Sequence, residues 1–491
     1  MSLASLGGPI HVDSSGVHEG PAAAATRLSY DAVEQRGRRK SPAIDSRSED
    51  LILDSSKRSK AQATSFDLCR NFSIARWMVR RHLDYVASFD FHSRTGNDKF
   101  DDEVDTFITR WSRKYNCDRA GRHPFWRMIR LSEMLRTTSG DCGLLKLSDG
   151  RLQAIEGDRV RNPSGLTIDG DKQQWVHGVK LDAGGKALAY SIHRRRLYGG
   201  FEFERTVPAS SLCLHAHLDR FDQVRGISPV MSALNPLRDV YENFDYALAK
   251  AKVTQLFALA ITSERNEDTA GETNVTRTEG TNSTTGETTA KYEVDFGKGP
   301  IKLELDPGDE AKFLESATPS TQFQDFTQLV IQVSLKALDI PYSFYDEAHT
   351  NFFGSRAAWL HYERSCLSKR GDILDLLNEL TMWRLMLAVI DGDLTLPQGM
   401  DLGGLAWEWV PLGMPWWDPA KEINGDLLAI GAGLDNPQRI TKDRGKGDWY
   451  SNVDQIAKAI AYAKSKDVSL SFVPLPQTVE VVPADEVQSG K

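Results

Sequence analysis

Residues 228–253 read SPVMSALNPLRDVYENFDYALAKAKV, and residues 319–338 read PSTQFQDFTQLVIQVSLKAL. Both segments repeat an apolar residue every three or four positions, which is the spacing of one face of an α-helix. The first apolar face comprises Val230, Leu234, Leu237, Tyr241, Phe244, Leu248 and Ala251. The second comprises Phe323, Phe326, Val330, Val333 and Ala337. We therefore predict two long helices, each with one face that must pack against another element.

The first helix has clear start signals in its sequence. Ser228 is a suitable N-cap, and Pro229 suits a first helical turn, where its missing N–H costs nothing. Pro236 lies further in and is predicted to kink or restart the helix, with Asn235 as a second cap.

About sixty residues separate the two helices, and they have a different character. Residues 266–291 consist almost entirely of Thr, Gly, Glu, Asn and Ser, so they lack the apolar side chains needed for a core. We predict a flexible or partner-ordered loop there. The flanking residues 256–261 and 292–305 are predicted to be strands.

The rest of the chain indicates an α+β protein. Apolar periodicity predicts helices over 65–86, 101–115, 124–137, 355–390, 418–431 and 453–464, with a break in the fourth of these at Gly371–Asp372. Alternating segments predict a hairpin over 144–155, with an Asp149–Gly150 turn, another over 176–193, and a strand over 405–410. Residues 1–60 are rich in Ser, Gly, Ala and charge, and are predicted to be disordered.

Composition narrows the functional classes. The formal net charge is −8, which argues against a protein that grips nucleic acid by neutralising many phosphates. It is compatible with a protein that surrounds DNA and lets it slide. The sequence has no run of about 18 apolar residues, so it predicts no membrane span. Its first residues do not resemble a secretory signal. The five scattered cysteines indicate reduced thiols.

Catalytic and cofactor signatures are absent from the sequence. It contains no GxxxxGK[ST], GxGxxG, HExxH or GxSxG motif, so we predict no catalytic residue, no cofactor and no metal. Cys213, His215, His217 and Asp219 could in principle bind a metal, but no second ligand cluster accompanies them, and a polar strand edge is the favoured interpretation.

Three other polar or aromatic clusters have a structural and a functional interpretation. The run Asp101–Glu103 is predicted to favour a helix N-terminus rather than to perform acid–base chemistry. Arg194–Arg196 could contact phosphate, form a solvated strand end or make a salt bridge between subunits. Trp416 and Trp417 are predicted to anchor a helix start.

Several segments, in their order along the chain, resemble the lambda-like family of tailed-bacteriophage portal proteins. They are FDLCRNFSIAR at 66–76, HLDRFDQVRGISP at 217–229 with its Gln-x-Arg-Gly core, its continuation from LRDVYE at 237–242 through AKAK at 249–252, NFFGSRA at 351–357 and WDPAKE at 417–422. The chain departs from the family at Phe72, where a second Asn is common, and in the segment 217–222, which usually carries Arg and Pro.

The resemblance implies a portal fold with defined parts. These are a disordered N-terminal tail (1–60), the first part of a wing (61–228), a stem helix (229–253), a clip (254–316) with its flexible insertion at 266–291, a second stem helix (317–340), a tunnel loop (341–355), a long helix with the second part of the wing (356–415), a helical crown (416–470) and a flexible C-terminal tail (471–491).

The resemblance also implies a dodecameric ring at one capsid vertex of the virion, assembled in the host cytoplasm. Double-stranded DNA would pass through it without sequence specificity. Its partners would be the terminase large subunit, head-completion or adaptor proteins, and major capsid and scaffold proteins, with no membrane involved. The alternatives are another ring-forming head–tail connector or a metal-dependent DNA-processing enzyme.

Two sets of residues receive roles on this basis. The residues expected to lie nearest the DNA are His349, Thr350, Asn351, Phe352 and Phe353. In a ring, each stem helix must bury one side against its neighbour. The residues expected to pack stem subunits together are Leu237, Tyr241, Phe244, Leu248, Phe323, Phe326, Val330 and Val333.

Overall fold

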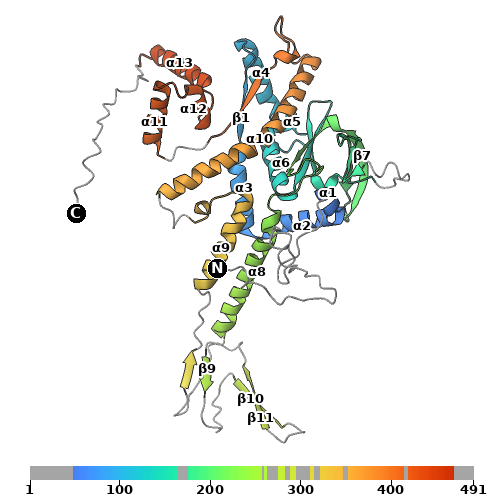
Figure 1. Cartoon of the computed structure of the whole chain (residues 1–491), viewed down its shortest axis with the longest axis vertical. Coiled ribbons are helices and arrows are strands. Elements are labelled where there is room, and N and C mark those ends of the chain that lie inside the picture. Colours follow the sequence, from blue (N-terminus) through green and yellow to red (C-terminus); the bar gives the residue numbers. More distant parts are fainter. Residues whose placement is uncertain are drawn as a thin grey trace, which may run out of the picture.

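The chain forms an elongated α+β structure whose helices and small sheets project in three directions from a helical centre (Figure 1). The computed structural model describes residues 48–163, 175–256, 259–262, 275–281, 288–294, 310–313, 321–346, 352–413 and 418–468. The predicted N-terminal tail is too long, because helices α1 (Glu49–Ile52) and α2 (Ser55–Asn71) already occupy its last residues. The rest of that tail, and the predicted C-terminal tail, lie outside the described residues.

The centre is built largely from helices, with one apolar core running through them. The predicted helix 65–86 is two helices, α2 and α3 (Ser73–Val86), because Phe72 between them is extended. Its ring packs against Tyr241, with ring centroids 5.4 Å apart. The remaining helices of this part are α4 (Asp98–Trp111), α5 (Lys114–Cys117) and α6 (Phe125–Ser139).

Two antiparallel sheets flank these helices. Strands β2 (Asp141–Lys146), β3 (Leu152–Glu156) and β8 (Leu212–Ala216) pair in the order β3-β2-β8. The second sheet has the order β4-β5-β6-β7, from Trp175–Val176, Val179–Leu181, Ala187–Arg195 and Phe201–Pro208. Both predicted hairpins are confirmed, and Gly150 supplies the positive φ that the first turn requires.

The two helices predicted to form a stem, called the stem below, lie side by side and lead to strands at one tip of the molecule (Figure 1). Helix α8 (Met231–Leu256) continues through Pro236, so the predicted restart is wrong. Helix α9 (Thr321–Leu335) ends in the 3₁₀ turn Lys336–Leu338.

The tip of the stem carries two strand pairs. Strand β9 (Leu259–Thr262) pairs with β12 (Glu310–Phe313), and β10 (Val275–Thr281) pairs with β11 (Thr288–Val294). The second pair lies largely within 266–291, where we predicted a flexible or partner-ordered loop. A hairpin can satisfy its backbone groups without a core, and Thr favours extended backbone, so the low apolar content did not exclude strands there.

The C-terminal third is mainly helical. Helix α10 (Phe352–Asp391) is uninterrupted, so the predicted break at Gly371 is wrong. The buried side chains of Ile373 and Leu377 hold this part of the helix against the core, which offsets the cost of about 1 kcal/mol for a helical glycine. The predicted strand is confirmed as β13 (Trp407–Pro411), which pairs with β1 (Phe89–Ser93).

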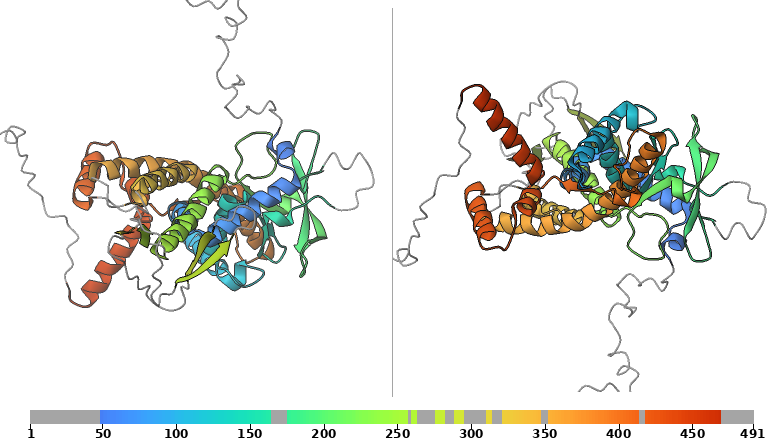
Figure 2. Two further views of the ribbon diagram at one scale, coloured as in Figure 1. Left: turned by 90° about the horizontal axis from the view of Figure 1, so that it is seen from below. Right: turned by 90° about the horizontal axis from the view of Figure 1, so that it is seen from above.

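Helices α11 (Pro419–Gly431), α12 (Pro437–Asp443) and α13 (Trp449–Ser465) form the last described unit. Asp418 caps α11, and α12 was not predicted. This unit and the β4–β7 sheet lie on opposite sides of the central helices (Figure 2). Among the described residues, no helix combines the length and apolar content needed to cross a membrane.

Candidate functional site

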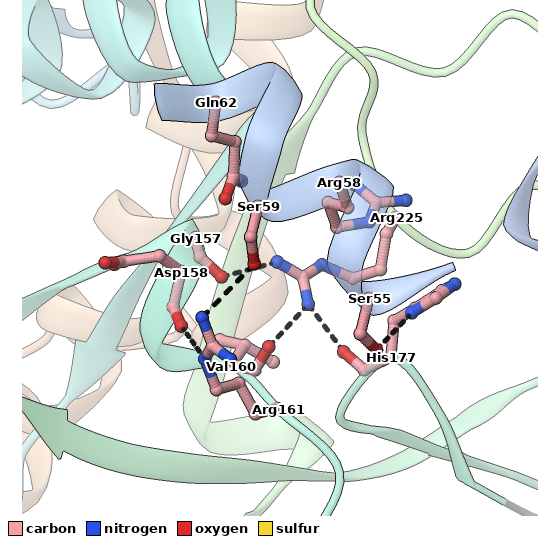
Figure 3. Close-up of a pocket in the computed structure, with 10 residues that line it drawn as sticks. All are labelled: Ser55, Arg58, Ser59, Gln62, Gly157, Asp158, Val160, Arg161, His177 and Arg225. Carbon is pink, nitrogen blue, oxygen red and sulfur yellow. Dashed lines mark hydrogen bonds between the residues drawn. The ribbon is translucent and has the colours of Figure 1, made fainter. Parts of the chain in front are cut away.

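The side chain of Arg225, six residues before α8, makes buried hydrogen bonds between the start of the stem and the sheets. Its Nε and Nη2 atoms donate to the two carboxylate oxygens of Asp141, at 2.6 and 2.8 Å. Its other N–H groups reach three backbone carbonyls: Gly157 at 2.7 Å, Val160 at 2.9 Å and His177 at 2.5 Å (Figure 3). All five donors of the guanidinium are therefore used, and neither Arg225 nor Asp141 is exposed to solvent.

The charge of this pair is stabilised by the contacts themselves. Burial has the largest single effect and would lower the pKa of Arg225, but Asp141, Asp50 and Tyr190 together outweigh it, and the net result is a raised pKa. Arginine presents its donors in a rigid fork, which suits simultaneous bonds to a carboxylate and several carbonyls. Arg225 thus fixes the segment before the stem to strand β2 and to two loops of the sheets.

Gly226 lets the backbone come close enough for this arrangement. A Cβ atom at Gly226 would lie 1.9 Å from the carbonyl oxygen of Gly140, and one at Gly140 would lie 2.4 Å from that of Gly226. The Gly226 N–H donates to Asp141 at 2.9 Å, and its carbonyl accepts from Arg58 at 2.6 Å. The Arg-Gly pair of the sequence motif therefore has one structural purpose, because both residues seat the chain on β2.

The neighbouring motif residues support the same junction. Gln223 donates from Nε2 to the carbonyls of Arg225 and His217, and so closes the turn that precedes the stem. Ser228, predicted as an N-cap, instead donates its hydroxyl proton to the carbonyl of Thr137 at the end of α6. This prediction is wrong because Ser228 lies before the first turn of α8 and faces another helix.

A second buried polar cluster ties together the helices around the stem base. The carboxylate of Glu133 on α6 contacts Nε2 of His82 on α3 at 2.6 Å and Nε2 of His215 on β8 at 2.8 Å. Arg136 donates to it at 2.8 Å and also pairs with Asp372 on α10 at 3.1 Å. Burial alone would raise the pKa of Glu133, but the hydrogen bonds from His215 and His82 hold it well below its ordinary value.

This cluster accounts for part of the candidate metal group. His215 faces Glu133, whereas His217 lies 3.7 Å from Asp219 across a partly exposed surface. Cys213 is buried, and burial raises the pKa of its thiol. In the part of the chain that the structure describes, no group of three His, Cys, Asp or Glu side chains could hold a metal ion.

The eight stem residues fall into three groups. Leu237 is buried in the chain's own core, and Tyr241 and Val330 are partly buried against that core. Their contact with a neighbouring subunit stays a prediction. Phe244 contacts Phe323 across the helix pair, with ring centroids 6.2 Å apart. The remaining three are exposed in the single chain, at 55% for Leu248, 57% for Phe326 and 61% for Val333.

The exposed stem residues form a continuous stripe on α9. Leu329, 56% exposed, lies between Phe326 and Val333 at spacings of three and four residues. Three large apolar side chains thus occupy one face of a helix that nothing in the described chain covers. Patches of this kind mark interaction surfaces.

The predicted tunnel loop is shorter than expected. Tyr342–Phe344 forms a 3₁₀ turn, and its aromatic rings pack on the core. The ring centroids of Phe344 and Trp359 are 5.5 Å apart. Phe352 and Phe353 already belong to α10, which begins three residues before the predicted end of the loop. His349, Thr350 and Asn351 lie outside the described residues.

The other charged candidates have partners within the chain. Arg194 and Arg196 pair with Glu202, and Arg195 pairs with Glu156 and Asp158, which supports the interpretation as a strand end. Asp101 lies in the first turn of α4 and accepts from Ser93 and Thr95, which supports its structural role. Trp416 and Trp417 lie outside the described residues.

The family described as phage portal protein, lambda family, matches residues 36–370. This range contains the motif at Arg225 and Gly226, both stem helices and the first half of α10. The chain belongs to the lambda family of phage portal proteins. The matched range ends before α11, so the family match itself does not cover the last helical unit. No curated protein matches the chain.

Three solved structures are similar to this portal-family chain. The virion of a native gene transfer agent (GTA) particle has a chain with 15% identity and a TM-score of 0.43, covering 79% of this chain and 98% of that one. The neck of an empty GTA particle computed with C6 symmetry has 13% identity and a TM-score of 0.44, covering 77% and 92%. The neck of a native GTA particle computed with C12 symmetry has 15% identity and a TM-score of 0.41, covering 79% and 98%.

Sequence reasoning identified the Gln-x-Arg-Gly segment but not what it does. The partners of Arg225 lie 48 to 84 positions away in the chain, so no local pattern connects them. Glu133 was missed for the same reason, because its histidine partners come from α3 and β8. One sequence signal that points to this junction is Gly140, a glycine at the end of α6 directly before the acidic Asp141.

Proposed function

We propose that this portal protein assembles as a dodecameric ring at a unique capsid vertex. The ring would be the channel for DNA packaging and ejection. It would also provide the docking site for the terminase large subunit and for head-completion or tail proteins, and it would contact major capsid and scaffold proteins. Family membership supports the portal role, and the uncovered apolar stripe on α9 is the observation in this chain that calls for a neighbouring subunit.

The chemistry of the described residues is consistent with a passive channel. At the stem base, Arg225 and Glu133 are buried and hydrogen-bonded to partners within the chain. We expect no catalytic activity, with the energy for DNA movement coming from a separate terminase. We also expect the protein to reside at the portal vertex of the virion and, before assembly, in the host cytoplasm.

The residues around 347–351 are proposed to approach the DNA in the channel. They connect the 3₁₀ turn Tyr342–Phe344, which is packed on the core, to the first turn of α10. A short segment held between two fixed ends can present its residues to a passing duplex without disturbing the ring.

The stem stripe provides the direct test of ring assembly. Leu329→Glu with Val333→Glu should abolish rings in negative-stain micrographs and shift native mass spectra to monomers, because the charges would have to be buried between subunits. Gln322→Glu, at an exposed polar position of the same helix, is the matched control and should still form rings. Rings of normal size in the double variant would show that this stripe is not the subunit interface, and a wild-type protein without rings would count against the portal role itself.

A further inference from the structure

Helices α4 and α5 lie at the end of the molecule opposite the tip of the stem (Figure 1). Residues of these helices, of the β2–β3 turn and of the C-terminal end of α10 line a pocket. Its volume is about 330 Å³, which is within the range of pockets that hold small ligands or inserted side chains. Its lining includes Phe107, Arg110, Tyr115, Arg151 and Arg384. Neither the stem nor the proposed channel uses this pocket.

Arg384 is the unusual member of the lining. Its side chain is only 10% exposed and lies over the ring of Phe107, with 4.5 Å between Cζ and the ring centroid. Gly150 leaves room for it, since a Cβ there would lie 3.2 Å from Cζ. Arginines this deeply buried normally have their donors satisfied.

The donors of Arg384 are largely unused. Its Nε and Nη1 atoms are buried and have no hydrogen-bond partner among the described residues. Its Nη2 atom reaches Asp393 only at 3.5 Å, which is the outer limit of a hydrogen bond. Burial lowers the pKa of Arg384, as expected for a cation with too little counter-charge nearby.

A second cation stands beside it. The guanidinium of Arg110 lies 5.9 Å from the centroid of the same Phe107 ring, and no ion pair is recorded for it within the described ranges. Arg151, by contrast, is occupied by a two-pronged contact with Asp149. The pocket therefore offers the two unused donor atoms of Arg384 and the guanidinium of Arg110, together with the ring of Tyr115, which is 68% exposed.

The charges at the rim select among anionic ligands. Asp149 and Asp393 also line the pocket, and they would repel a phosphodiester chain, which carries a charge on every residue. A duplex is too wide to enter. A single carboxylate fits better, because it can accept from Arg384 and Arg110 while the rest of its chain stays clear of the two aspartates.

We propose that this pocket binds an acidic side chain, flanked by an aromatic or large apolar residue, from a segment of another protein. The carboxylate would complete the unused donors of Arg384, and the apolar neighbour would pack on Tyr115. The inference does not depend on the proposed channel function, since the pocket lies in the wing and not in the stem.

The test uses the full-length protein and the probe peptide acetyl-Gly-Phe-Asp-Phe-Gly-amide in isothermal titration and saturation-transfer NMR. The matched peptide with Asn in place of Asp should bind at least about tenfold more weakly, because charge-assisted hydrogen bonds are lost. Arg384→Met and Arg110→Gln should each weaken the Asp peptide by a similar factor. Arg119→Gln, a neighbouring arginine outside the pocket that bonds Gln153, should have no effect.

Several results would overturn the proposal. The Asp peptide could fail to bind at about 1 mM, or the Asn peptide could bind equally well. Unchanged binding in Arg110→Gln would also overturn it. That variant changes an exposed side chain and should leave the fold intact, so it can be tested even if Arg384→Met unfolds the protein. A five-nucleotide oligothymidylate that binds more tightly than the peptide, and loses binding in Arg110→Gln, would assign the pocket to nucleic acid instead.

Discussion

Replacing Arg225 by methionine should loosen the junction between the stem and the sheets more than any other single change at the stem base. The substitution removes five hydrogen bonds, leaves Asp141 as a buried unpaired carboxylate and frees three buried carbonyls. Removing one partner of a buried ion pair costs about 3–5 kcal/mol. We therefore expect the local opening free energy around β2 and β3 to fall by about that amount.

Native-state hydrogen exchange read by mass spectrometry is the suitable assay, because a chain of this size need not unfold in one step. Peptides covering 141–146 and 152–156 should lose protection in Arg225→Met. The matched control is Arg195→Met, whose partners Glu156 and Asp158 are also carboxylates but whose side chain is 48% exposed. Exposed ion pairs contribute about 0–1 kcal/mol, so this control should change protection little.

A double-mutant cycle separates the ion pair from the rest of the junction. Asp141→Asn should also be costly, and the double variant Arg225→Met with Asp141→Asn should cost less than the sum of the two, by about 2 kcal/mol or more. Additive effects, or a change below about 1 kcal/mol in Arg225→Met, would refute the view that this pair fixes the stem.

Three further predictions concern the same region and the channel. Gly226→Ala should destabilise the junction by about 2 kcal/mol or more in the exchange assay, since its Cβ would lie 1.9 Å from the Gly140 carbonyl; Gly425→Ala, in open space on α11, is the control. Glu133→Gln should destabilise the protein at pH 7 in thermal melts. The folded pKa of Glu133 is depressed, so its contribution to stability is present above the unfolded pKa near 4.3 and is lost as the pH falls from there through the folded pKa. The melting temperatures of the two proteins should therefore converge only below about pH 4. A constant difference down to pH 3 would contradict this. Deleting residues 348–353 should leave ring assembly intact in micrographs but reduce packaged DNA, and failure of the rings to form would show that the loop assignment is wrong.

The long helices could be predicted from the sequence because their apolar periodicity extends over many turns. Helices α8 and α10 were placed to within a few residues. The errors within them came from reading Pro236 and Gly371 as breaks. Both residues have low helix propensity, but the packing of the same helix against the core outweighs the free-energy cost of placing them in its interior.

The junction could not be predicted in the same way. Arg225 looks like an ordinary charged residue in a polar turn, and only the folded chain brings the carbonyls of Gly157, Val160 and His177 around it. The pocket at Arg384 was missed for a related reason, because α4 and the end of α10 are far apart in sequence. The β10–β11 hairpin was missed because composition reports the absence of a core but not the pairing of backbones.

The break at Phe72 bears on how the nascent chain survives its own synthesis. At about 5–20 residues per second, the ribosome needs roughly 3–13 s to make the residues between the end of α8 and the start of α9. During that time the apolar face of α8 lacks its partner helix. Phe72 is synthesised before α8, and in the folded chain its ring packs against Tyr241 and Phe244. The ring of Phe72 is therefore a cover for the apolar face of α8 that does not depend on the synthesis of α9.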